Sequence, residues 1–136
     1  MSWDVLVLKA PGEVVGVDEL PKDFDPGPIG SLRDVLDRLR RHVPLIDLSD
    51  PTWGRMESEN WSIEVNIGSD DPVESVMLHV RGGGDDVVPI VVETARILGC
   101  RALDVSSGEF LSDGDTAGWR AFQEYRDRVI DHRRGI

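Results

Sequence analysis

Two neighbouring stretches, Trp61-Ser-Ile-Glu-Val-Asn-Ile67 and Val76-Met-Leu-His-Val-Arg81, carry the pattern from which the rest of the fold is built. In each stretch apolar and polar residues alternate, which is typical of a strand with one buried face. The segment Gly68-Ser-Asp-Asp-Pro72 between them is rich in turn-forming residues, so the sequence predicts a hairpin. With the apolar rows on one face, the opposite face carries Glu64, Asn66, Ser75, Met77, His79 and Arg81.

A helical pattern lies on each side of this hairpin in the chain. Residues 32–43 place apolar side chains at helical spacing, with Ser31 before them as an N-cap and Pro44 after them as a stop. A second helix is expected to begin at Asp85 or Asp86 and to end at Gly99. The hairpin is therefore expected to pack against helices contributed from both sides.

Strands next to these helices complete a recurring order. Residues 3–8 are apolar on both faces, which predicts a central strand, and residues 102–105 predict a short strand. Two strand–helix–strand units around one hairpin predict an α+β fold, the ferredoxin-like split βαβ sandwich. An extra short strand over 53–57 and a C-terminal helix from about Thr116 are additions to it. Right-handed crossovers would place the crossover helices on one side of a mixed sheet and leave its other face uncovered.

The length of 136 residues predicts a single domain over 1–136. A chain of this size buries roughly two-thirds of its unfolded surface, which is enough for a core without disulfides or structural metals. One segment departs from the regular pattern: residues 11–30 form a long connecting loop that is rich in proline and glycine. Loops of this length are uncommon in compact domains and are usually functional or mobile.

Several protein classes are excluded by composition. Cys100 is the only cysteine, so no intramolecular disulfide or cysteine-rich zinc site is possible, and we expect a buried, inert thiol. No apolar run approaches the ~20 residues of a membrane span, and the first residues lack the features of a secretory signal. We expect a cytoplasmic protein that binds no membrane, no metal and no cofactor.

The formal net charge is −11 at pH 7, from 26 acidic and 15 basic residues. This charge opposes binding to nucleic acids and anionic membranes, and it favours a basic partner. Between Asp47 and Asp86 the chain has ten acidic residues against two arginines, so most of the net charge arises there. Such a patch would speed the encounter with a basic protein and make it sensitive to salt.

Several stretches resemble a set of small acidic bacterial proteins to which no activity is assigned. They are Asp50-Pro-Thr-Trp-Gly54, Asp71-Pro-Val-Glu-Ser75, His79-Val-Arg-Gly-Gly83, Arg101-Ala-Leu-Asp104 and Gly108-Glu-Phe-Leu111. The resemblance spans most of the chain and implies no catalytic residue. In size and acidity the chain is also similar to bacterial toxin-immunity proteins, although no motif carries that likeness.

Our first functional hypothesis is a non-enzymatic interaction protein that binds a basic protein partner, and an immunity or inhibitor protein is its sharpest version. An exposed tryptophan within a charged rim would anchor such a partner, and the acidic side chains would steer it. The predicted partner-binding residues are Trp53, Glu57, Glu59, Trp61, Asp70, Asp71 and Glu74.

Two alternatives remain open. In the first, the polar sheet face around Glu64 and His79 binds a small molecule or acts as an enzyme. A carboxylate beside a histidine is the minimal acid–base pair, and Arg81 could bind an oxyanion, so the weak catalytic candidates are Glu64, His79 and Arg81. In the second, a homodimer hides the open sheet face, which an apolar patch around Met77 would favour.

Overall fold

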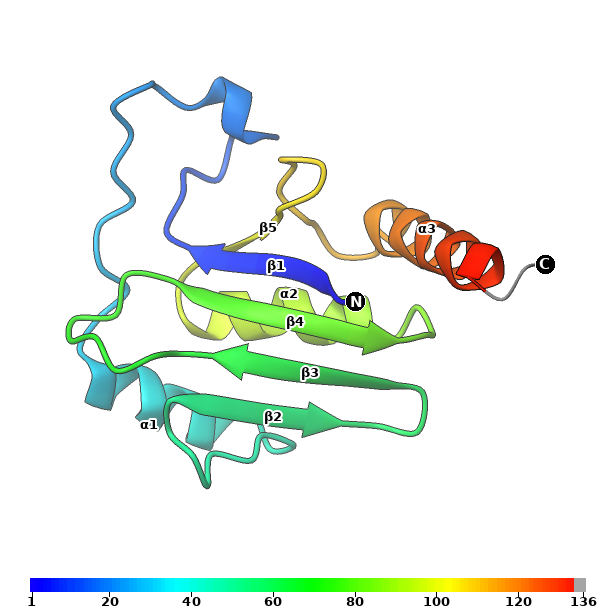
Figure 1. Ribbon diagram of the computed structural model, residues 1–136. Coiled ribbons are helices and arrows are strands. Elements are labelled where there is room, and N and C mark those ends of the chain that lie inside the picture. Colours follow the sequence, from blue (N-terminus) through cyan, green and yellow to red (C-terminus); the bar gives the residue numbers. More distant parts are fainter. Residues whose placement is uncertain (134–136) are drawn as a thin grey trace.

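The computed structural model describes residues 1–133 and has a five-stranded sheet with helices, which confirms the α+β class (Figure 1). The elements are β1 (Trp3–Leu8), the short 3₁₀ helix η1 (Val17–Glu19), α1 (Leu32–His42), β2 (Trp53–Glu57), β3 (Trp61–Asn66), β4 (Val76–Gly82), α2 (Val87–Ile97), β5 (Arg101–Asp104) and α3 (Ala117–Arg133). The strand order in the sheet is β2-β3-β4-β1-β5, so β1 lies inside the sheet, as its apolar pattern predicts.

The prediction of a mixed sheet is wrong, because every pair of neighbouring strands is antiparallel. The reason is that each crossover connection passes over one intervening strand of the sheet. The helix α1 connects β1 to the β2–β3 hairpin, but β4 lies between β1 and β3 in the sheet. In the same way β1 lies between β4 and β5, which α2 connects. Strands that run parallel to each other are therefore never neighbours.

The predicted division of the central hairpin into an apolar and a polar face is confirmed. Across β3 and β4, Glu64 faces His79 and Asn66 faces Met77. The apolar row on the other face, Ile63, Val65, Leu78 and Val80, is fully buried. The helices α1 and α2 cover this buried face (Figure 1). The main core therefore lies between the helices and the sheet, and the polar row lies on the opposite side.

The helix starts differ in how they are capped. At α1 the Ser31 hydroxyl oxygen accepts the backbone N–H of Asp34 at 3.1 Å, as predicted. A side-chain cap of this kind contributes about 1 kcal/mol to stability. At α2 the N-cap residue is Asp86, but its side chain makes no capping hydrogen bond. Its carboxylate instead accepts the indole N–H of Trp61 at 3.2 Å. The acidic residue at this helix start therefore also fixes a core tryptophan.

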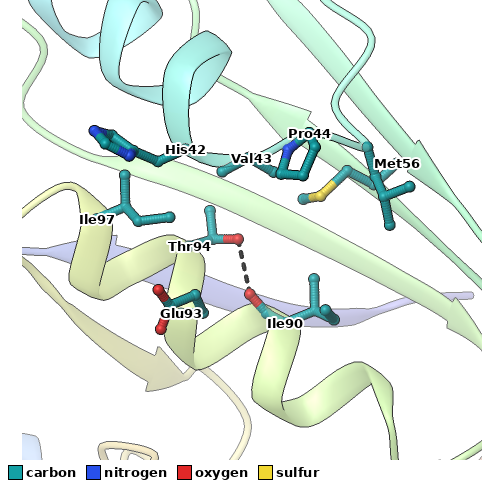
Figure 2. Close-up of a pocket in the computed structure, with 9 residues that line it drawn as sticks. His42, Val43, Pro44, Met56, Ile90, Glu93, Thr94 and Ile97 are labelled. Carbon is teal, nitrogen blue, oxygen red and sulfur yellow. Dashed lines mark hydrogen bonds between the residues drawn. The ribbon is translucent and has the colours of Figure 1, made fainter.

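An apolar cavity of about 150 Å³ lies where the end of α1 approaches α2 (Figure 2). Val43, Met56 and Ile90 are among its lining residues, and His42 and Glu93 lie at its margin. The one buried polar side chain in its wall, Thr94, donates its hydroxyl hydrogen to the Ile90 carbonyl at 2.8 Å. The cavity is therefore an apolar gap in the helical layer, with its buried hydroxyl already satisfied.

The loop over residues 11–30 is attached to the face of β1 and β5 that points away from the helices. Val14 and Leu20 pack there against a small cluster formed by Leu8, Leu103 and Phe110. Two backbone hydrogen bonds fix the loop, from Val17 N–H to the Gly108 carbonyl at 2.9 Å and from Phe110 N–H to the Val15 carbonyl at 2.8 Å. The loop thus covers one end of this face. The part formed by β2, β3 and β4 lies outside this contact.

At both edges of the sheet, a short neighbouring segment forms backbone hydrogen bonds with the edge strand. At β2, Asp47 exchanges hydrogen bonds with Arg55, and the two N···O distances are 2.7 and 3.0 Å. At β5, Leu103 pairs with Phe110, and the Leu111 N–H donates to the Ala102 carbonyl at 2.8 Å. Paired backbone groups cannot template another strand. These edges are therefore less suited to binding than the open face.

We expect the Gly82→Ala substitution to lower the free energy of unfolding by about 2 to 4 kcal/mol. Gly82 has a φ of +100°, and a Cβ atom there would lie 2.2 Å from the Asn60 carbonyl oxygen. Because both are backbone positions, the contact is relieved only by moving β4 away from the β2–β3 turn. Urea unfolding followed by fluorescence measures the change.

Gly12→Ala is the matched control, since no heavy atom lies within 4 Å of a Cβ built at Gly12. Its free energy of unfolding should change by less than about 0.5 kcal/mol. Equal stabilities for the two variants would contradict the assignment of a backbone constraint at Gly82.

Candidate functional site

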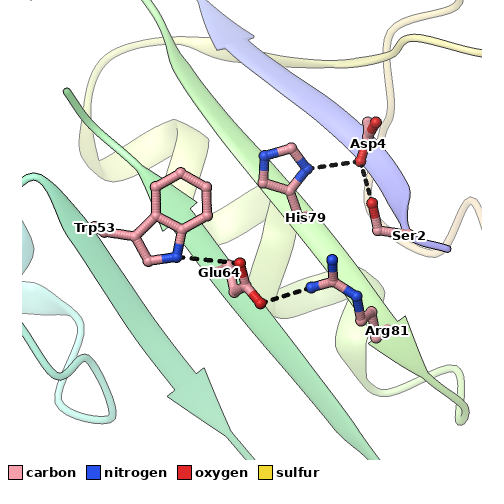
Figure 3. A network of polar contacts seen from close by, with 6 residues as sticks. All are labelled: Ser2, Asp4, Trp53, Glu64, His79 and Arg81. Atoms are coloured by element: carbon pink, nitrogen blue, oxygen red, sulfur yellow. Dashed lines mark hydrogen bonds and ion pairs between the residues drawn. The ribbon is translucent and has the colours of Figure 1, made fainter.

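The candidate site is the outer face, which we define as the solvent-facing side of β1–β4 around Asp4, Trp53, Glu64, His79 and Arg81 (Figure 3). Each side chain is placed by strand alternation, since residues two apart on a strand point to the same side. Sheet pairing brings Glu64 opposite Arg55 on β2 and opposite His79 on β4. The site therefore combines four strands without using a loop.

Glu64 uses both of its carboxylate oxygens within this face. Its Oε1 accepts Nη1 of Arg81 at 2.7 Å, and its Oε2 accepts the indole N–H of Trp53 at 3.1 Å. Arg81 is two residues from His79 on β4, so its guanidinium lies diagonally across from Glu64. The two predicted residues Glu64 and Arg81 are therefore brought together, but as an ion pair and not around a ligand.

His79 pairs with a residue that the sequence did not suggest. Its Nδ1 lies 2.8 Å from Oδ1 of Asp4, which also accepts the hydroxyl hydrogen of Ser2 (Figure 3). Because a carboxylate only accepts hydrogen bonds, the hydrogen of this contact is on Nδ1 of His79. Glu64 faces His79 across the strands, yet its carboxylate is directed to Arg81 and Trp53.

Trp53 contacts both the Glu64–Arg81 pair and the Asp4–His79 pair. Its ring stacks on the His79 ring with 5.7 Å between centroids and 17° between planes. The residue remains 37% exposed, so part of the indole faces solvent. Held by Glu64 on one side and His79 beneath, Trp53 is an exposed aromatic ring with a fixed orientation. Trp61, which the sequence analysis grouped with it, is only 5% exposed and packs into the core.

The predicted acidic residues form two groups at opposite ends of the sheet. Glu57 and Glu59 lie at the β2–β3 turn, and Asp70, Asp71 and Glu74 lie in the β3–β4 connection. Since β3 runs between these ends and has six residues, the groups are about 20 Å apart. Asp71 also has a structural role, because its Oδ1 accepts the Leu32 N–H at the start of α1 at 3.1 Å. The acidic patch is therefore divided, with the outer face between its halves.

A shallow hollow of about 360 Å³ adjoins the outer face at the β2–β3 turn. Glu57, Glu59 and Arg81 are among the residues that line it. It brings two exposed acidic residues and the arginine that pairs with Glu64 within reach of the same surface contact.

Two further carboxylates stay ionised near this face. The hydrogen bonds from the Ser49 hydroxyl and backbone N–H hold the pKa of Asp47 below its ordinary value. The hydroxyl and backbone N–H of Thr52 lower the pKa of Asp50 in the same way. Hydrogen bonds to the charged form stabilise it, so both groups remain negative to lower pH than free aspartates.

The remaining chemistry-bearing groups give little support for catalysis or metal binding. Burial raises the pKa of the Cys100 thiol to about 11, although Lys9 and Arg38 lower it slightly. Within residues 1–133 no group of three or more His, Cys, Asp or Glu side chains could hold a metal ion. In the same part of the chain, no helix has both the length and the apolar character needed to cross a membrane.

Comparisons with known proteins add no functional assignment: no family model, no curated protein and no solved structure matches the chain. The resemblance to small acidic bacterial proteins therefore stays a prediction, and functional argument has to rest on the geometry of this chain.

We expect Cys100 to react with iodoacetamide roughly a hundredfold more slowly than an unperturbed thiol at pH 8. Only the thiolate reacts, and a pKa of about 11 leaves a very small thiolate fraction at that pH. Mass spectrometry of the native protein over time measures the rate. Unfolding in urea is the control, because it should restore the rate of an ordinary cysteine. Fast labelling of the folded protein would contradict the burial of the thiol.

Proposed function

We propose that this chain is a non-enzymatic acidic interaction protein, which binds a basic protein partner through the outer face. The observation that carries the proposal is the fixed orientation of Trp53, which bonds to Glu64 and stacks on His79 while 37% exposed. Large aromatic side chains at the centre of a contact supply most of its binding energy. A ring that is already ordered loses little conformational entropy on binding.

The negative charge of the chain supports the proposal of a basic partner. The net charge is −11, and acidic groups flank the outer face at both ends of the strands. Such a distribution accelerates encounter with a positive surface and makes the on-rate depend on salt. An immunity or inhibitor protein against a basic toxin is the sharpest form of this proposal, and the cytoplasm is the compartment we propose for it.

The ferredoxin-like split βαβ sandwich is the architecture we propose for the central part of the chain. In its favour, strands β3-β4-β1-β5 follow one another in the sheet. The helix α1 lies in the connection from β1 to the β2–β3 hairpin, and α2 connects β4 to β5, so each crossover passes one intervening strand. In this assignment β2 is an additional edge strand beside β3, and α3 is an additional helix that follows β5 in the chain. An open face opposite the helices, which such sandwiches have, is what the proposed binding mode requires.

The alternative function, binding or converting a small molecule at the outer face, has one observation in its favour. The Asp4 carboxylate contacts Nδ1 of His79 and so orients the imidazole ring, as in a carboxylate–histidine pair. In that case Asp4 and His79 would be the acid–base pair, with Glu64 and Arg81 beside it. A homodimer through the outer face is the remaining alternative for the partner.

A pull-down from a lysate of the source cells at about 50 mM and about 500 mM salt tests the proposal, since the Debye length falls from roughly 14 Å to roughly 4 Å. A basic protein should be retained at low salt and weakened at high salt. The Trp53→Ala variant should lose about tenfold or more in affinity for that protein, as expected for a central aromatic contact.

Leu45→Ala is the matched control for Trp53→Ala. Leu45 is 56% exposed but lines the cavity on the helical side of the molecule. Its substitution removes an exposed apolar side chain away from the outer face and should leave partner affinity unchanged. Equal losses in both variants, or none in Trp53→Ala, would remove the outer face as the binding surface.

With the partner identified, reversing the charges of Asp70 and Glu74 to lysine should reduce the association rate about tenfold at low salt. The dissociation rate should change much less, since these exposed carboxylates act at a distance. Asp71 is left intact because it supports α1. Surface plasmon resonance at several salt concentrations measures both rates.

The control reverses Glu124 and Asp131, two exposed acidic residues on α3, and changes the net charge by the same amount. If it slows association as much as the Asp70 and Glu74 pair, net charge alone and not the end of the outer face steers the partner.

A further inference from the structure

A second candidate site lies away from the outer face, at the end of β5. A cavity of about 260 Å³ opens there between the turn after Asp104 and one side of α3. In Figure 1 this is the region where the chain leaves β5 and reaches the start of α3. Asp104 faces the same side of the sheet as Val5, which is fully buried, so the cavity belongs to the helical side of the molecule.

Asp104 is a buried carboxylate that uses only one of its oxygens. The residue is 2% exposed, and its Oδ1 accepts the backbone N–H groups of Ser106 and Ser107 at 2.9 and 3.4 Å. Over residues 1–133, no hydrogen bond or ion pair reaches Oδ2. Oδ2 is not among the fully buried polar atoms without a partner, so it keeps some accessible surface and has unused acceptor capacity.

Gly118 allows the start of α3 to approach that oxygen closely. A Cβ atom at Gly118 would lie 2.3 Å from Oδ2, closer than any real contact, so another residue there would displace the carboxylate. Asp104 and Gly118 both line this cavity and a neighbouring one on the other side of the same contact.

The rest of the cavity is suited to an aliphatic chain with a positive end. Gly118, Ala121, Phe122 and Tyr125 follow the spacing of one helix face and form its apolar wall. Phe122 is already in contact with Trp119 and with the Arg126 guanidinium. Tyr125 is 55% exposed, so its ring is the aromatic surface available to a cation.

The arginines closest to this site along α3 are engaged elsewhere. Arg120 pairs with Asp85, and Nη1 of Arg126 donates to the Gly82 carbonyl at 2.6 Å. No lysine or arginine is among the residues that line either cavity. Over residues 1–133, no lysine or arginine therefore offers its charge to Asp104.

We propose that this cavity binds an alkyl cation, an alkylguanidinium or alkylammonium group. Its charged head is bound by the carboxylate of Asp104, and its stem lies against Ala121 and Tyr125. The same group occurs in free small amines and in the arginine or lysine side chain of a protein. The site is separate from the outer face, so a test of this proposal does not depend on the partner proposed for that face.

Titration with n-propylguanidinium chloride, followed by the amide NMR signals of Ser106, Ser107 and Gly118, tests the proposal. We expect saturable shifts with a dissociation constant of about 1 mM, in the range of a ligand with few atoms. The neutral analogue n-propylurea has the same shape without the charge and should bind at least tenfold more weakly. An arginine-containing tripeptide and its citrulline counterpart form a second arm, which distinguishes a free amine from a protein side chain.

Three variants locate the binding. Asp104→Asn should weaken n-propylguanidinium binding at least tenfold, and Tyr125→Ala, at an exposed position, should weaken it several-fold. Glu124→Gln is the matched control, because it removes an exposed charge on α3 outside the cavity and should change nothing. The absence of saturable shifts up to about 20 mM, equal binding of n-propylurea, or unchanged binding in both cavity variants would overturn the proposal.

Discussion

The pairing of β1 with β4 is the contact on which the rest of the molecule depends. It joins the first strand to the second half of the hairpin unit and so places β1 between β4 and β5. On the buried side it sets Val5 against Leu78 in the core, and on the other side it sets Asp4 against His79. One register therefore determines both the packing beneath the helices and the polar network of the outer face. A shift by one residue would reverse both sides at once.

How much the sequence could predict depends on how far apart along the chain the interacting residues lie. The register of β3 and β4 is visible in local alternation, so the shared face of Glu64 and His79 is predicted correctly. Alternation does not say which side chains on that face pair. The Asp4–His79 contact joins residues 75 apart, and Asp4 interrupts a strand that otherwise reads as apolar on both faces. Nothing short of the strand order could have identified it.

The two tryptophans near the acidic segment illustrate the same limit. Trp53 and Trp61 are both strand residues, and composition cannot separate an exposed indole from a buried one. The distinction comes from the phase of each strand. Trp61 continues the buried row of Ile63 and Val65, whereas Trp53 precedes the buried Gly54 and Met56 by an odd number of positions. The phase of a five-residue strand is hard to assign when glycine supplies one of its two buried positions.

The outer face can stay exposed in the absence of a partner because its polar groups satisfy one another. Asp4 and His79 form one pair and Glu64 and Arg81 another, so these four side chains are satisfied within the face. This arrangement also disfavours a symmetric homodimer through the same surface. A two-fold axis along the strands would oppose each acidic end to itself, and an axis across them would oppose Glu57 and Glu59 to Asp70 and Glu74. In both cases like charges meet, which argues for the positively charged partner that we propose over a second copy of this surface.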